Sequence, residues 1–142
     1  MFAFARHVTI EWGDCDPAGI VYYPRYFAMF DASTAALFAA ALGYNKFEML
    51  RRHDIIGIPM VDTGAKFLVP SRYGDVVAIE SHVAFLKRSS FGVAHVLRRA
   101  DGATGIEAYE TRVWAAKHPE REGKIIGVAM PEEVRQKLGA GS

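Results

Sequence analysis

The stretch from Pro24 to Leu42 constrains the fold of this chain more than any other. Its apolar residues recur at helical spacing, and alanine fills much of the remainder. Pro24 suits the first turn of a helix, where its missing N–H costs nothing, and Gly43 supplies a stop. A helix that is apolar on most sides is buried rather than lying on the surface. The sequence therefore predicts one long helix covered by a sheet.

Segments with strand character surround this helix. Strands are expected at residues 4–12, 76–86, 91–100, 105–116 and 125–130, with another that runs from an extended stretch at 55–61 through Val69. Short helices are expected at 46–53 and 131–138, and Asp101-Gly102 is predicted to form a hairpin turn. The pattern indicates one α+β domain over residues 1–142, with an antiparallel sheet of five or six strands around a central helix. Edge strands of such a sheet often pair across subunits, so a homo-oligomer is expected.

Composition excludes several classes of partner. The 142 residues are 51% hydrophobic and 23% charged, which is typical of a globular protein. A net charge of +1 provides no general attraction to nucleic acid or to a membrane surface. The apolar run at 32–42 is too short to span a bilayer, and the N-terminus is too quickly charged for a secretory signal. The lone Cys15 fits a reducing compartment, so we expect a cytoplasmic protein.

The loop at residues 13–23 is the main candidate for chemistry. It carries Asp14 and Asp16 between a predicted strand and the start of the long helix. A carboxylate there faces unpaired backbone N–H groups and the positive end of the helix dipole. This arrangement can polarise a carbonyl oxygen beside a nucleophile or base. Turn formation alone also accounts for both aspartates, because Asp, Gly and Pro dominate turns for backbone reasons.

The two aspartates differ in their local restraints. Asp16 lies between Cys15 and Pro17, and a following proline restricts its backbone. Asp14 is free to turn back onto backbone N–H groups. These restraints give Asp16 the reactive role and Asp14 a structural one.

Other chemistries find no support in the sequence. No glycine spacing for nucleotide phosphates and no nucleophile-elbow motif is present, and no metal site or cofactor is expected. Cys15 is flanked by two carboxylates, which oppose thiolate formation. The histidines lack metal-ligand spacing; they are His7, His53, His82, His95 and His118.

A second constellation combines two cations with two hydroxyls at the end of a predicted strand. Its members are Lys87, Arg88, Ser89 and Ser90. Such groups can hold a phosphate by charge-assisted hydrogen bonds. A solvated turn between strands explains the same residues equally well.

Taken together, these residues resemble the hotdog-fold acyl-CoA thioesterases, most closely the 4-hydroxybenzoyl-CoA thioesterase family. The similarity runs from about Ile10 to Phe91 and rests on a D-x-D-x-x-G-x-V-x-Y loop that opens a long helix. Further matches are Pro24, Tyr26, Asp31-Ala32, Gly57, Pro59, Val61, Phe67, Asp75-Val76, Ile79-Glu80, Arg88 and Ser90-Phe91.

The resemblance implies homodimers or homotetramers with active sites at the subunit interface. By position, Asp16 matches the catalytic carboxylate, and the Tyr23 backbone N–H matches the donor to the thioester carbonyl. Asp31 matches an acid near the acyl pocket. The matches to substrate-lining positions are Ile58, Pro59 and Met60, and those to the segment that meets the CoA phosphates are Lys87, Arg88, Ser89 and Ser90.

The expected activity is hydrolysis of an aroyl-CoA, or a related acyl-CoA, to free acid and CoA. Asp16 acts as nucleophile or general base; the residues do not decide which. Pro24 stands where short-chain thioesterases of the Tol–Pal cluster carry histidine, which favours the aroyl branch. Ile58 replaces a family threonine, and Lys46-Phe47 stands where a tryptophan is expected. The alternatives are a short-chain aliphatic acyl-CoA thioesterase and a non-catalytic acyl-CoA-binding protein.

Overall fold

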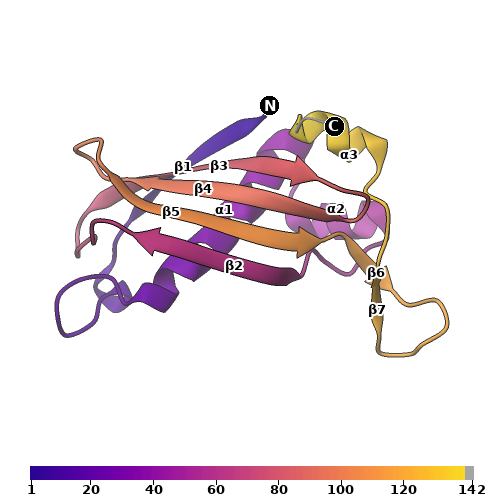
Figure 1. Cartoon of the computed structure of the whole chain (residues 1–142), viewed down its shortest axis with the longest axis horizontal. Coiled ribbons are helices and arrows are strands. Elements are labelled where there is room, and N and C mark those ends of the chain that lie inside the picture. Colours follow the sequence, from indigo (N-terminus) through magenta and orange to yellow (C-terminus); the bar gives the residue numbers. More distant parts are fainter. Residues whose placement is uncertain (140–142) are drawn as a thin grey trace.

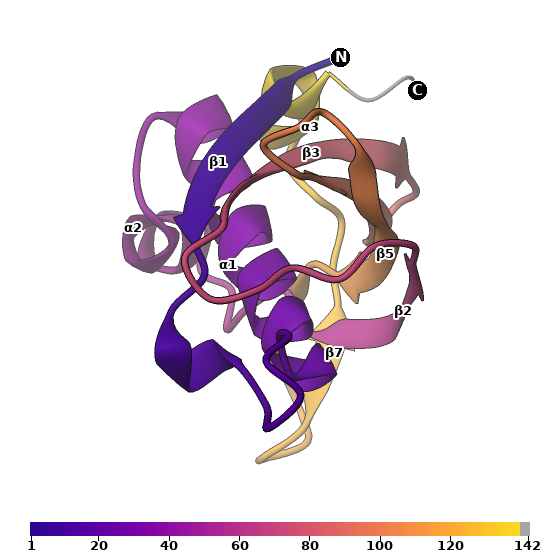
Figure 2. The ribbon, with the colours of Figure 1, turned by 90° about the vertical axis from the view of Figure 1, so that its left-hand side faces the viewer.

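The computed structural model describes residues 1–139 and shows a long helix packed in a curved antiparallel sheet (Figures 1 and 2). The helices are α1 (Tyr23–Leu42), α2 (Lys46–His53) and α3 (Glu132–Leu138), with a 3-10 turn η1 (Trp12–Asp14). The strands are β1 (Ala3–Thr9), β2 (Met60–Phe67), β3 (Val76–Leu86), β4 (Ser90–Arg98), β5 (Thr104–Val113), β6 (Ala115–Lys117) and β7 (Ile125–Gly127).

The main sheet has five strands in the order β1-β3-β4-β5-β2. All neighbouring pairs are antiparallel, and β6 and β7 form a separate two-stranded ribbon. Seen along α1, the sheet curls around the helix from β1 through β3 to β5 and β2 (Figure 2). The α+β fold with a central helix and a five-stranded antiparallel sheet is therefore confirmed.

Local sequence sets the ends of the helices. The chain leaves α1 through Gly43, whose φ of 86° lies in the left-handed region that glycine adopts readily. Asn45 caps α2 by accepting a hydrogen bond from the Glu48 amide at 2.9 Å. No single helix in residues 1–139 has both the length and the apolarity to cross a membrane; only α1 and α2 together do, and they are bent by 65°.

The inner face of the sheet and α1 enclose two groups of apolar side chains. The group beside the C-terminal half of α1 includes Leu37, Phe38, Met49, Phe91, Trp114, Val134 and Leu138. The group beside the N-terminal half includes Ile10, Tyr26, Phe30, Ile79, Leu97 and Ile106. Burial of these side chains is the main force that holds α1 inside the sheet.

A layer of buried polar side chains lies between the two apolar groups. We call it the polar belt; its members are Ser33, Thr34, Ser81, His95, Glu110 and Arg112. On β3 and β4 the belt residues fall between apolar residues of the same face, as His95 does between Val93 and Leu97, whereas Glu110 and Arg112 are adjacent on the inner face of β5. Buried polar groups are costly unless they are hydrogen-bonded, so the belt has to be satisfied internally.

Three expectations from the sequence are wrong in detail. The first strand ends at Thr9 rather than Trp12, because residues 12–14 form the η1 turn. The fifth strand ends at Val113, because the chain beyond Trp114 leaves β4 and pairs with β7 as the short strand β6. Strand β7 covers only residues 125–127 and pairs with β6, so it is not an edge of the main sheet.

Candidate active site

The segment from Asp14 to Tyr22 is a tight hairpin that leads directly into α1. The Tyr22 amide donates to the Asp14 carbonyl at 2.8 Å, and the Asp16 amide donates to the Ile20 carbonyl at 2.9 Å. Gly19 closes the turn with a φ of 81°. The hairpin thus holds Asp16 at the N-terminal end of the helix.

Both aspartates accept backbone hydrogen bonds, but they do so differently. Asp14 Oδ2 accepts from the Glu11 amide at 2.9 Å and so caps the η1 turn. Asp16 Oδ1 accepts from the Ala18 amide at 2.8 Å, which fixes the orientation of its carboxylate. Within residues 1–139, no donor reaches Asp16 Oδ2. Asp16 therefore keeps one oxygen available while its side chain is held in place.

The start of α1 offers a free hydrogen-bond donor. The Tyr23 amide is the first of the helix, and no group in the described chain accepts from it. The next residue, Pro24, has no N–H at all. A hollow of about 280 Å³ adjoins this point, and its lining is almost wholly apolar: Ile20, Val21, Tyr23, Tyr26, Phe67, Val69, Pro70 and Ile106. The hollow can receive an apolar or aromatic group beside the free amide.

The second half of the predicted site is built around an arginine that the sequence did not single out. Arg112 Nη2 binds Asp31 Oδ1 at 2.6 Å, Nη1 donates to the Ile58 carbonyl at 2.9 Å, and Nε donates to Glu110 Oε1 at 2.9 Å. A hollow of about 290 Å³ beside it is lined by Lys46, Ile56, Gly57, Ile58, Pro59, Arg112 and Ile125. The structure thus brings predicted substrate-lining residues together through Arg112.

Hydrogen bonds to Glu110 control its charge. Burial by itself raises the pKa of Glu110, but hydrogen bonds from His95, Arg112 and Thr34 outweigh burial and lower that pKa to about 2. The His95 ring completes the belt, with Nδ1 at 2.7 Å from Ser81 Oγ and Nε2 at 3.2 Å from Thr34 Oγ1. Glu110 is therefore a buried, ionised carboxylate.

A signal for these residues is present in the sequence. Side chains at alternate positions of a strand share one face, so Glu110 and Arg112 lie on the same face as the apolar Ile106 and Ala108. The same alternation places His95 beside Val93 and Leu97. Charged residues on the buried face of a strand have to be paired. Their partners Thr34 and Asp31 lie on α1, far away in the chain, so no local motif marks the pairing.

The segment Lys87–Ser90 is a well-anchored turn at the far end of the sheet. Its backbone makes four hydrogen bonds: the Lys87 amide to the Ser90 carbonyl, Trp114 to Ser89, Met130 to Arg88, and the Arg135 guanidinium to Lys87. The side chains of Lys87 and Arg88 are exposed, and neither forms an ion pair with a described residue. A fixed backbone with two free cations suits the binding of a phosphate.

Within one chain the predicted parts of the site lie far apart. The Asp16 hairpin contacts the chain just beyond β2, where Phe67 pairs with Ile106, whereas Ser90 pairs with Val113 at the opposite end of β5. Seven residues of strand separate Ile106 from Val113, which is a span of about 24 Å. Asp31 is eight residues beyond Tyr23 on α1, or about 12 Å along the helix. One chain therefore does not bring Asp16 to Lys87–Ser90.

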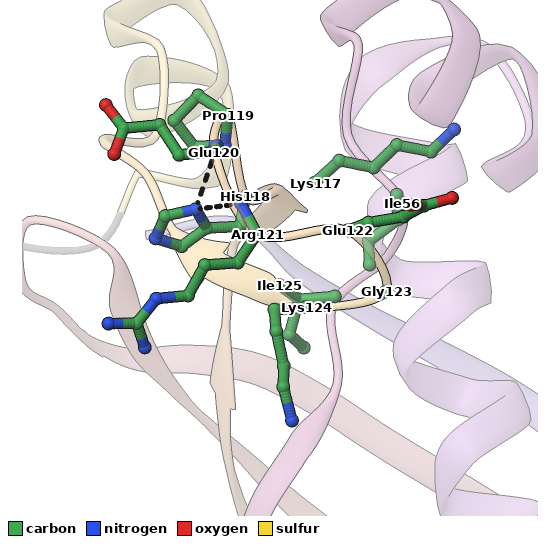
Figure 3. A pocket seen from close by; sticks show the side chains of 10 residues that line it. All are labelled: Ile56, Lys117, His118, Pro119, Glu120, Arg121, Glu122, Gly123, Lys124 and Ile125. Carbon is green, nitrogen blue, oxygen red and sulfur yellow. Dashed lines mark hydrogen bonds between the residues drawn. The ribbon is translucent and has the colours of Figure 1, made fainter.

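A hollow of about 550 Å³ lies at the turn between β6 and β7 (Figure 3), at the opposite end of the molecule from the Asp16 hairpin (Figure 1). Lys117, Arg121 and Lys124 surround it together with Glu120 and Glu122. In the close-up, their charged ends point in different directions rather than toward one point, and His118 Nδ1 accepts two backbone hydrogen bonds of the turn. Mixed, diverging charges do not define a binding site.

Comparisons with known proteins agree with this geometry. Residues 10–138 match the model of the thioesterase-like superfamily. The chain is 34% identical over 125 residues to the 4-hydroxybenzoyl-CoA thioesterase of Pseudomonas sp. (strain CBS-3), which covers 82% of this chain and 89% of that protein. A solved structure of a 4-hydroxybenzoyl-CoA thioesterase mutant complexed with 4-hydroxybenzoyl-CoA has a TM-score of 0.87 at 29% identity, over 97% of this chain and 99% of the other.

A gentisyl-coenzyme A thioesterase, BH1999, has a similar structure, with a TM-score of 0.81 at 27% identity over 95% of this chain and 99% of the other. The fold and these relatives define a hotdog-fold enzyme that cleaves thioesters. The chain belongs to the thioesterase-like superfamily. The expected enzyme class, a thioester hydrolase, is thereby confirmed.

The lowered pKa of Glu110 makes stability depend on pH. A glutamate with an ordinary pKa of 4.5 in the unfolded chain and about 2 in the folded chain stabilises the fold fully above about pH 4.5. That contribution is lost as the pH falls from about 4.5 to about 2. We expect Glu110→Gln to be less stable than the wild type at neutral pH, with the difference shrinking across this window in urea unfolding. Glu107→Gln, an exposed glutamate on the same strand, serves as the control; parallel curves for Glu110→Gln and wild type would contradict this account.

Proposed function

We propose that this protein hydrolyses an aroyl-CoA thioester to a free aromatic acid and CoA. The observation that carries the proposal is the pairing of an oriented Asp16 carboxylate with the free Tyr23 amide at the start of α1. The relatives named for their substrates act on 4-hydroxybenzoyl-CoA and gentisyl-CoA, both hydroxylated aroyl thioesters. The hollow beside Tyr23 presents the ring faces and edges of Tyr26 and Phe67, which suit an aromatic acyl group.

The Asp16 carboxylate in the hairpin and the Tyr23 amide just after it have separate roles in the reaction. The Tyr23 amide, at the positive end of the α1 dipole, donates to the thioester carbonyl oxygen and stabilises the charge that develops there. Asp16 Oδ2 either attacks the carbonyl carbon or takes a proton from an attacking water. In the first route the thiolate of CoA leaves from a mixed anhydride on Asp16, which water then hydrolyses to the free acid and the regenerated carboxylate; in the second route water adds directly and the thiolate leaves from the tetrahedral intermediate. Both routes need the same carboxylate in the same place.

A second subunit supplies the missing part of the site in this proposal. Strand β2 is an edge of the sheet, and Val61 and Phe67 on it are exposed. When two copies pair their β2 strands antiparallel about a two-fold axis, the Met60 end of one strand lies beside the Phe67 end of the other. The partner copy's segment 87–90 then lies at the same end as Asp16 of this chain. The proposal therefore includes a homodimer; the homodimer, its further pairing into a homotetramer and a cytoplasmic location stay predictions.

Two other functions remain as alternatives. A short-chain aliphatic acyl-CoA thioesterase would use the same Asp16 and Tyr23 with a different acyl pocket. Ile58 of this chain, which stands where the family has a threonine, is the departure that keeps this alternative open. A non-catalytic acyl-CoA-binding protein gains nothing from a carboxylate aimed at the carbonyl. Following free thiol from benzoyl, hydroxybenzoyl, phenylacetyl and acetyl-CoA separates the three.

Asp16→Asn removes the carboxylate and keeps its shape. We expect kcat for hydroxybenzoyl-CoA to fall by about 10² to 10⁴, the range for loss of an acid–base group. Asp14→Asn is the matched control, since the asparagine oxygen can still accept from the Glu11 amide, and it should stay near the wild-type rate. An Asp16→Asn enzyme as fast as the wild type would remove Asp16 from the mechanism.

Arg88→Ala tests the phosphate contact. KM for a full-length acyl-CoA should rise by about tenfold, the size of one charge-assisted hydrogen bond. KM for the matching acyl-pantetheine, which lacks the nucleotide, should not change. Arg51→Ala, an exposed arginine of α2 paired with Glu48, is the control and should affect neither substrate. Equal changes for both substrates would argue against a phosphate at Arg88.

Mixing the Asp16→Asn chain, expected to be inactive, with the Arg88→Ala chain, expected to be impaired at low substrate, tests whether the site crosses the subunit boundary. In a heterodimer of Asp16→Asn and Arg88→Ala chains, one of the two sites combines an intact Asp16 with an intact Arg88 of the other chain. Random co-refolding of equal amounts should therefore restore about a quarter of wild-type activity at low substrate. A site built within one chain predicts no recovery, which would overturn the proposed dimer.

A further inference from the structure

Arg112 connects three segments of the chain from a buried position. Its side chain is only 5% exposed, and its three nitrogen atoms donate to acceptors on α1, on the segment before β2 and on its own strand β5. The acceptors are Asp31 Oδ1, the Ile58 carbonyl and Glu110 Oε1. No other side chain in the described structure contacts both Asp31 and the Ile58 backbone through hydrogen bonds.

The two outer partners are residues proposed to line the acyl pocket. The Asp31 side chain is 58% exposed, so without Arg112 it would sample several rotamers at the surface of α1. The segment before β2 is held to the sheet by bonds from Ala115 to the Gly57 carbonyl and from Val113 to the Pro59 carbonyl. Between them, Arg112 is the one donor to the Ile58 carbonyl within residues 1–139. Arg112 therefore fixes the Asp31 side chain relative to the Ile58 backbone, which lines the hollow.

The inner partner fixes Arg112 itself. Glu110 is 1% exposed and accepts from Thr34 and Arg112, while His95 lies 3.4 Å from the same carboxylate oxygen. Burial lowers the pKa of Arg112, but its hydrogen bonds to Glu110 and Asp31 raise that pKa above its ordinary value. The guanidinium is thus charged and restrained from the inside by the polar belt. A planar fork is needed for this geometry, because a lysine ammonium cannot reach three acceptors in these directions.

We infer that Arg112 is a positioning residue for acyl recognition. It acts by holding the Asp31 side chain and the Ile58 backbone in fixed positions relative to each other. The inference rests on the proposed function: in the proposed dimer the Met60 end of one copy lies beside the Phe67 end of the other, so the hollow that Arg112 lines in one copy adjoins the Tyr23 hollow that receives the acyl group in the other. It adds Arg112, which lies outside the Asp16 loop, to the residues that determine which substrate is accepted. It also ties that choice to Glu110, which touches no part of the hollow.

A purely structural role for Arg112 makes different predictions. Removing a buried charge partner destabilises a fold whatever the substrate, and the loss of activity then follows the unfolded fraction. A positioning role acts through Asp31 instead, so changes at the two residues do not multiply. Activity measured well below the melting temperature of each variant separates these two roles.

The experiment uses Arg112→Lys, Asp31→Asn and the double variant. We expect each single change to lower kcat/KM for hydroxybenzoyl-CoA by about 10- to 100-fold, as a misplaced contact does, and the double variant to lose no more than the worse single one. Asp31→Asn should keep the wild-type melting temperature, because its side chain is largely exposed. Arg98→Lys, at an exposed arginine paired with Glu80 on β4, is the matched control and should change nothing.

The outcomes separate this inference from the proposed function. Wild-type hydrolysis with losses that multiply in the double variant overturns the positioning role and leaves the function standing. A wild type that releases no thiol overturns the function; binding of free 4-hydroxybenzoate, measured by calorimetry on the same four proteins, then decides the inference. Weaker binding that is no worse in the double variant supports it. Equal binding by all variants, or none by the wild type, overturns it.

Discussion

The buried ion pair of Glu110 and Arg112 is the constraint on which the rest of the structure depends. Two charges inside a core are tolerated only when each has its hydrogen bonds, because the cost of unpaired burial exceeds that of losing an apolar contact. Here α1, β3, β4 and β5 each supply a member of the polar belt. The helix and the three strands can satisfy all of them in one relative position.

This requirement specifies the register of the sheet more sharply than apolar packing does. A slip of two residues between β3 and β4 would keep apolar side chains on the inner face, since side chains alternate with a period of two. It would also separate Ser81 from His95, which now lie directly opposite each other. The orphaned imidazole and hydroxyl would remain in a dry core. The polar belt therefore destabilises shifted strand registers that the hydrophobic pattern alone would allow.

Much of the fold was predictable because it rests on local signals. The long helix follows from its apolar spacing with Pro24 and Gly43 near its ends, and the hairpin at Asp101-Gly102 follows from turn chemistry. The strand ends were harder, because the end of β5 depends on the pairing of the following residues, as β6, with β7 about ten residues further along the chain. The Asp16 loop was found from its own residues. Arg112 was not, because its role depends on Asp31, which is 81 residues away in the chain.

The exposed edge of β2 has a consequence for the newly made protein. A strand edge with free backbone groups and exposed apolar side chains such as Val61 can pair with any other unpaired strand. A newly made chain therefore carries a surface that promotes aggregation until it is covered. In the proposed dimer, the contact that completes the active site is also the contact that hides this surface. Assembly and solubility would then depend on the same eight residues of β2. A substitution there would lower the yield of soluble protein before it lowered the catalytic rate.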